Sequence, residues 1–185
     1  MGQYYRIAYD DGKLHINDRK VAGKDYMMAK LMEHSYFGNS LMDSMSSVIY
    51  KNPTRVIWVG DYANEGDEVS DATSGDVEYK DVWGDDAKLN DVLKPVKFDY
   101  RGKYLVNHTK GVYISFDKYL DGENDQEIHP LSILTSIGNG RGGGDYEGSN
   151  MDYVGTWAWD KIEIVDDAPG GMKELEIVFN EDWGK

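Results

Sequence analysis

The residues best suited to acid–base chemistry are four histidines, at positions 15, 34, 108 and 129. Histidine transfers protons near neutral pH because its ordinary pKa is about 6.5, and a neighbouring carboxylate strengthens this behaviour. The spacing matches no metal-binding motif such as H-E-x-x-H, so we expect no metal site and no cofactor. A small enzyme or a nucleotide-ligand-binding protein would require the fold to gather one set of residues into a concave pocket: His34, Asp61, His108, His129 and Arg141.

A glycine-rich segment, residues 138–144, contains a formal G-x-G-x-x-G match and leads into Asp145. A dinucleotide site needs a helix that begins on those glycines, with its amide groups facing the pyrophosphate. The residues that follow Asp145 are typical of a turn instead, and the chain has no Gly-Lys-Ser/Thr sequence. The dinucleotide-binding motif and the phosphate-binding P-loop are therefore both excluded. Two interpretations remain open: a structural loop with positive φ angles, or a loop that lets the backbone of a partner approach around Arg141.

Carboxylates gather most densely between residues 61 and 91, where eleven acidic residues stand against two lysines, for a net charge of −9. One interpretation is a solvated loop that keeps the protein soluble. The other is a carboxylate surface that imitates the phosphates of nucleic acid, since duplex DNA carries one charge per about 1.7 Å of axis. Tyr62, Tyr79 and Trp83 would supply anchors in that surface. Only the second interpretation requires the segment to fold.

The whole chain is acidic as well: its 185 residues include 34 acidic and 20 basic side chains, giving a formal net charge of −14. Such a surface repels nucleic acid and favours basic partners. There is no cysteine, which excludes disulfides and thiolate metal sites and favours a reducing, cytoplasmic compartment. No secretory signal or membrane-spanning stretch is evident, so we expect no membrane association.

The hydrophobic pattern predicts an α+β fold in a single domain, residues 1–185, with the acidic loop or insertion at about 61–91. We expect an antiparallel sheet of hairpins with two N-terminal helices packed on it. The helices are expected at 25–34 and 39–51, the second capped by Asn39. The expected strands lie at 4–9, 13–17, 55–60, 104–107, 112–116, 157–165 and 174–179, with a short one near 77–79. The pattern at 131–137 fits either a helix or a strand.

Four strings carry a resemblance to a known family. They are residues 30–36, 56–62, 104–110, and the stretch that runs from 129–131 into the glycine-rich loop. Together they resemble a family of small proteins carried by phages and mobile elements of gut Firmicutes, itself similar to a type II-A anti-CRISPR protein, an inhibitor of Cas9. The similarity covers nearly the whole chain.

The resemblance implies a non-enzymatic protein that binds Cas9 in the cytoplasm of a bacterial host cell and blocks DNA engagement or cleavage. Nucleic acid would be contacted only indirectly or weakly. The acidity agrees with this expectation, because Cas9 holds its nucleic acids in positively charged channels. The resembling strings lie mostly outside the acidic segment, so the hairpin at Asn107 or the Arg141 loop are further candidates. The residues expected to contact the partner are Asp61, Glu65, Asp67, Glu68, Asp71, Asp76, Tyr79, Trp83, Asn107, His108 and Arg141.

Overall fold

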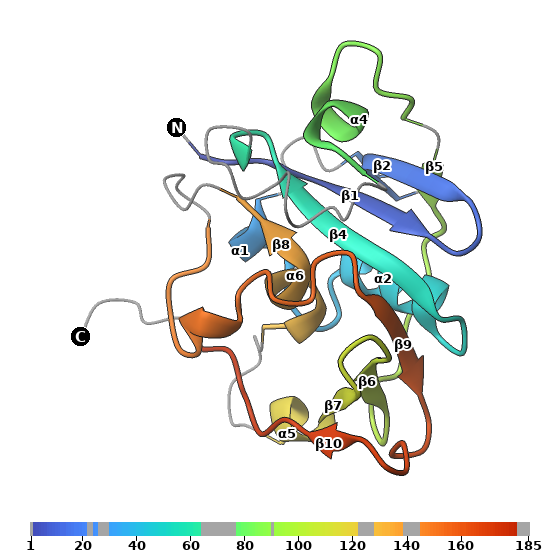
Figure 1. Ribbon diagram of the computed structural model, residues 1–185, viewed down its shortest axis with the longest axis vertical. Coiled ribbons are helices and arrows are strands. Elements are labelled where there is room, and N and C mark those ends of the chain that lie inside the picture. Colours follow the sequence, from blue (N-terminus) through green and yellow to red (C-terminus); the bar gives the residue numbers. More distant parts are fainter. Residues whose placement is uncertain are drawn as a thin grey trace.

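One mixed β-sheet organises the protein. The computed structural model describes residues 2–21, 24–25, 30–63, 77–89, 91–121, 128–138 and 145–180 (Figure 1). Within these residues the strands are β1 (Tyr5–Asp10), β2 (Leu14–Val21), β3 (Lys24–Asp25), β4 (Thr54–Gly60), β5 (Asp91–Leu93), β6 (Tyr104–Asn107), β7 (Val112–Ser115), β8 (Ser136–Ile137), β9 (Lys161–Val165) and β10 (Lys173–Glu174). The helices are α1 (Leu31–His34), α2 (Ser40–Ile49), α4 (Tyr79–Trp83), α5 (Asp117–Leu120), α6 (Pro130–Thr135) and the 3-10 turn η2 (Met151–Tyr153).

The strand order is β10-β7-β6-β9-β4-β1-β2-β3, with β5 paired to β2 and β8 to β4. The hairpin β1–β2 and the hairpin β6–β7 confirm the predicted strand pairs. Gly12, with φ of 115°, supplies the left-handed conformation that the first turn needs. The two halves of the sheet meet where β9 pairs with the first two residues of β4, Thr54 and Arg55.

The central strands β1 and β4 are buried on both faces. Along β4, Val56 and Trp58 face the larger core, whereas Ile57 and Val59 face a smaller one. Helices α1, α2 and α6 contribute to the larger core, and α4 packs on the opposite face. A strand buried on both faces reads as a continuous apolar run, which is why the stretch before Asp61 was recognisable in the sequence.

Helix α2 forms where the apolar spacing predicts it. The side chain of Asn39 caps the helix by accepting a hydrogen bond from the amide of Leu41 at 2.9 Å. Leu41, Met45 and Ile49 then recur along its buried face. The helix ends at Ile49, and Lys51 turns the chain back with a φ of 52°.

Several expectations need correction. The sheet is mixed rather than antiparallel, because the pairs β2–β5, β4–β8 and β7–β10 run parallel.

The first helix does not begin at residue 25, which lies in β3. Helix α1 spans only 31–34, and residues 26–29 lie outside the described part. No strand forms at 77–79, because a capping box between Glu78 and Asp81 begins α4 there. The expected strands 157–165 and 174–179 are reduced to β9 and β10. The stretch 131–137 is both, α6 followed by β8.

No helix in the described ranges is long and apolar enough to cross a membrane.

A buried carboxylate joins α2 to the segment before β6. Asp43 is 1% exposed, and its Oδ1 accepts a hydrogen bond from the Tyr100 hydroxyl at 2.9 Å. Its Oδ2 forms no hydrogen bond within the described residues and lies 3.7 Å from the ammonium group of Lys97. A buried carboxylate is costly unless it is hydrogen-bonded, so this carboxylate depends on the Tyr100 hydroxyl.

Replacing that hydroxyl tests the dependence. We expect Tyr100→Phe to lower the free energy of unfolding by about 1–3 kcal/mol, because it leaves the Asp43 carboxylate buried without its donor. Tyr104→Phe is the matched control, since it removes a hydroxyl from a partly exposed tyrosine on β6 and should change stability by less than about 0.5 kcal/mol. Urea denaturation of both variants measures the difference. Equal decreases in the free energy of unfolding would show that the hydrogen bond between Tyr100 and Asp43 does not stabilise the fold.

Candidate functional site

One end of the sheet brings together polar residues from distant parts of the chain. Strands β4 and β8 are parallel and finish at this end, where the antiparallel β1 begins. Here the Asp145 carboxylate accepts hydrogen bonds from the Gln3 amide at 3.0 and 3.1 Å and from the Tyr5 hydroxyl at 2.5 Å. Gln3 and Tyr5 are buried, and Asp145 is partly exposed. We call Gln3, Tyr5, Asp61 and Asp145 the Asp145 cluster.

Two glycines allow this close packing. A Cβ atom on Gly138 would lie 2.6 Å from the Tyr5 hydroxyl and 2.7 Å from Nε2 of Gln3, and one on Gly60 would overlap the Gln3 side chain. Neither glycine has a positive φ, so space rather than backbone conformation demands them. The glycine that opens the predicted glycine-rich loop is therefore structural: it leaves room for the side chains that hold Asp145.

Asp61 links the same end of the sheet to α4. Its amide donates to the carbonyl of Tyr4 at 2.8 Å, and its carboxylate accepts from the amide of Tyr4 at 3.0 Å. Its own carbonyl accepts from the Tyr79 hydroxyl at 2.6 Å. Asp61 thus extends the β1–β4 pairing by one residue and anchors the first turn of α4.

The electrostatics of the cluster favour anchoring over proton transfer. Burial, followed by the Asp145 carboxylate and more weakly by Asp61, raises the pKa of Tyr5 well above its ordinary value. The Tyr5 hydroxyl therefore stays protonated at neutral pH and acts as a permanent donor to Asp145. Such a cluster fixes the residue that follows the glycine-rich loop onto the sheet.

The acidic segment is folded where the structure describes it, at residues 77–89. Helix α4 is held on the sheet by Trp83, whose indole nitrogen donates to the carbonyl of Val59 at 2.9 Å. The guanidinium of Arg6 stacks over the Trp83 ring at 4.0 Å and donates to the carbonyl of Val82 at 2.7 Å. Tyr79 and Trp83, expected as anchors for a partner, thus anchor α4 to its own sheet.

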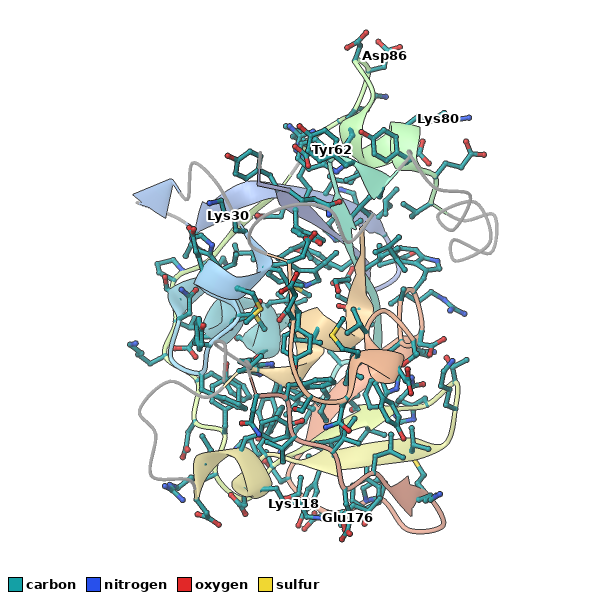
Figure 2. All side chains as sticks on the ribbon, turned by 90° about the vertical axis from the view of Figure 1, so that its left-hand side faces the viewer. Lys30, Tyr62, Lys80, Asp86, Lys118 and Glu176 are labelled. Carbon is teal, nitrogen blue, oxygen red and sulfur yellow. The ribbon has the colours of Figure 1, made fainter. Side chains whose placement is uncertain are left out.

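The exposed carboxylates of this region are those of Glu78, Asp85 and Asp86. Figure 2 shows Asp86 at the tip of the loop that follows α4, at the opposite end of the molecule from Lys118 and Glu176. Six of the residues expected to contact a partner lie outside the described part of the chain: Glu65, Asp67, Glu68, Asp71, Asp76 and Arg141.

Asn107 and His108 hold the turn of the β6–β7 hairpin against β9. The Asn107 amide donates to the carboxylate of Asp160 at 2.7 Å, and its oxygen accepts from the amide of Lys110 at 3.0 Å. His108 is exposed, with Nε2 2.7 Å from a carboxylate oxygen of Glu163. Each of these contacts stays within the hairpin and its neighbouring strand.

His129 caps α6 from inside the larger core. Its Nδ1 accepts from the amide of Leu131 at 3.1 Å, and its ring packs against Phe37, Tyr100 and Phe116. Burial lowers the pKa of His129 to about 3, so the ring is neutral at physiological pH.

Of the residues expected to line one pocket, Arg141 lies outside the described part of the chain, and His108 and Asp61 are not brought together. The amide of His108 donates to Lys161, which pairs with Arg55 at the start of β4, whereas Asp61 follows its end. At about 3.3 Å per residue, six residues of strand place these positions about 20 Å apart. His129 is wholly buried, and Nδ1 of His34 lies 3.1 Å from the carbonyl of Lys30. No group of three or more potential metal ligands occurs among the residues described.

Sequence reasoning missed Gln3 and Tyr5. Their partner Asp145 lies about 140 residues away, and no local pattern marks a buried glutamine near an N-terminus as a hydrogen-bond donor to so distant a carboxylate.

Comparison of the chain with protein-family models, with curated proteins and with solved structures finds no match in any of the three.

The close contact at Gly138 can be tested by adding one methyl group. We expect Gly138→Ala to lower the free energy of unfolding by about 1–3 kcal/mol, because the added Cβ must displace Gln3 or Tyr5 from Asp145. Gly170→Ala is the control, since its Cβ would meet no atom within 4 Å. Thermal or urea unfolding compares the two. If Gly138→Ala lowers the free energy of unfolding no more than Gly170→Ala does, the Asp145 cluster accommodates the added methyl group without losing stability.

The buried imidazole predicts a pH dependence. The folded-state pKa of His129 lies below its unfolded value of about 6.5, so between about pH 6.5 and 3 only the unfolded chain binds this proton. Stability from this residue is complete above pH 6.5 and is lost as the pH falls, by about 1.4 kcal/mol between pH 7.5 and 5.5.

Urea denaturation at the two pH values measures this loss, with His129→Asn as the reference because asparagine retains capping ability without titrating. We expect the loss between pH 7.5 and 5.5 to be smaller in the variant by about 1.4 kcal/mol. An identical loss in both proteins would show that folding does not lower the pKa of His129.

Proposed function

We propose that this chain is a non-enzymatic inhibitor that binds a basic surface of another protein, with Cas9 as the partner that the family resemblance implies. Its contact region would be the acidic α4 surface, which comprises Glu78, Asp81, Asp85 and Asp86. The observation that carries the proposal is that residues 77–89 are folded and tied to the sheet by Tyr79, Trp83 and Arg6. A surface that imitates phosphates must be ordered in this way, because ordering a loop upon binding costs affinity.

Charge supports a basic partner. The chain carries a formal net charge of −14, and the segment 61–91 alone contributes −9. Complementary charge mainly accelerates association and excludes partners of like sign, which here include nucleic acid. Cas9 offers basic channels for guide RNA and target DNA, so an acidic protein seated there would compete with DNA. In this proposal the protein acts in the cytoplasm of a bacterial host cell.

The alternative enzyme or nucleotide-ligand binder gains no support from the geometry of the described residues. His129 is buried and neutral, and His108 lies near the start of β4 whereas Asp61 follows its end. We therefore propose no second function.

Cleavage of a PAM-bearing DNA by purified Cas9 tests the proposal. We expect the protein to reduce cleavage when it is added before the DNA, while a folded acidic protein of equal net charge does not. Adding it before or after guide loading identifies the blocked step. Unchanged cleavage across several Cas9 orthologues would contradict the proposal.

Paired variants test the contact surface. We expect Asp85→Asn with Asp86→Asn to weaken inhibition by about two- to thirtyfold, because the basic groups of the bound protein lose two carboxylates with which to pair. Asp167→Asn with Glu176→Gln is the control: it removes the same charge from exposed residues outside the acidic α4 surface. The difference between the pairs should shrink as salt rises. Equal inhibition by both variants would exclude the acidic α4 surface as the contact.

A further inference from the structure

A groove lies between β2 and the acidic α4 surface. It encloses about 620 Å³, which falls within the range of ligand-binding clefts. The residues that line it are Leu14, Ile16, Lys80, Asp81, Gly84, Asp85, Asp86 and Lys88. Figure 2 shows two of them, Lys80 and Asp86, near the same end of the molecule.

The floor of the groove is apolar. Leu14 packs against the smaller core while remaining partly exposed, whereas Ile16 is 4% exposed and lies within that core. Leu89, directly after the lining residue Lys88, is 42% exposed and is one of two large hydrophobic side chains exposed among the described residues. Exposed apolar area beside a polar rim marks a surface that another molecule can cover.

The rim of the groove carries three aspartates and two lysines, for a net charge of −1. Asp85 and Asp86 are exposed and form no ion pair within the described residues. Of the two lysines, Lys80 forms an ion pair with Glu78 at 2.5 Å, and Lys88 is exposed. Asp81 uses its carboxylate in the capping box of α4, which leaves the other two aspartates to meet a cationic group.

We infer that this groove binds a short segment of a partner protein in which an apolar side chain is flanked by arginine or lysine. The apolar side chain packs on the exposed part of Leu14, and the cation lies between Asp85 and Asp86. The aspartates of the rim outnumber its lysines and the chain carries a formal net charge of −14, so the occupant is a protein segment rather than nucleic acid. The inference rests on the proposed function, since it specifies which part of a basic partner the acidic α4 surface contacts.

An NMR titration of the full chain with the acetylated, amidated peptide Arg-Leu-Arg tests the inference. We expect saturable shifts in the methyl resonances of Leu14 and Ile16 and in the amides of 80–88. The control peptides are Glu-Leu-Glu, which should not bind, and Arg-Ser-Arg, which should bind at least threefold more weakly. Leu14→Ala and the pair Asp85→Asn with Asp86→Asn should each weaken Arg-Leu-Arg binding at least threefold.

Equal binding of Arg-Ser-Arg would overturn the inference, because attraction by charge alone would then explain the shifts. Shifts spread equally over Asp167 and Glu176 would overturn it as well. The titration contains no Cas9, so the two proposals fail separately. Peptide binding without inhibition of Cas9 contradicts the proposed function but supports the groove as a binding site. Inhibition of Cas9 without peptide binding supports the proposed function but contradicts the groove as a binding site.

Discussion

Strand β4 is apolar on both faces, and both layers of the protein pack on it. Trp58 and Val56 face the core that α2 and α6 cover, while Ile57 and Val59 face the smaller core beneath α4. Burial of apolar side chains on both sides is the main stabilising contribution in such a strand. Because the carbonyl of Val59 also accepts the hydrogen bond from Trp83, the same strand determines where the acidic α4 surface sits.

The end of β4 positions both the Asp145 cluster and helix α4. Gly60 leaves room for Gln3, which donates to Asp145, and Asp61 binds Tyr79 at the start of α4. Gly138 and Asp145, which flank the glycine-rich segment, and helix α4 are therefore held at the end of β4. Tyr79, Trp83 and Arg6 hold helix α4 on the sheet, so this helix needs no ordering when a partner binds.

Local patterns made much of the fold predictable. Asn39 marks the start of α2, and the Asp-Asp-Gly turn marks the first hairpin, because each signal acts within a few residues. The short strand expected near 77–79 is instead the start of α4, because the capping box between Glu78 and Asp81 outweighs the β-propensity of these residues. The Asp145 cluster and the burial of His129 depend on contacts between segments far apart in the chain, which no local pattern encodes.

We propose that residues 77–89 form a folded acidic surface that contacts a basic protein. Hydrogen–deuterium exchange of this chain, alone and mixed with guide-loaded Cas9, tests it most directly. The account predicts new protection concentrated in 77–89 and in β2 around Leu14, with little change at the β6–β7 turn. Protection confined to the turn at 107–111, or no change anywhere in the chain, would contradict it.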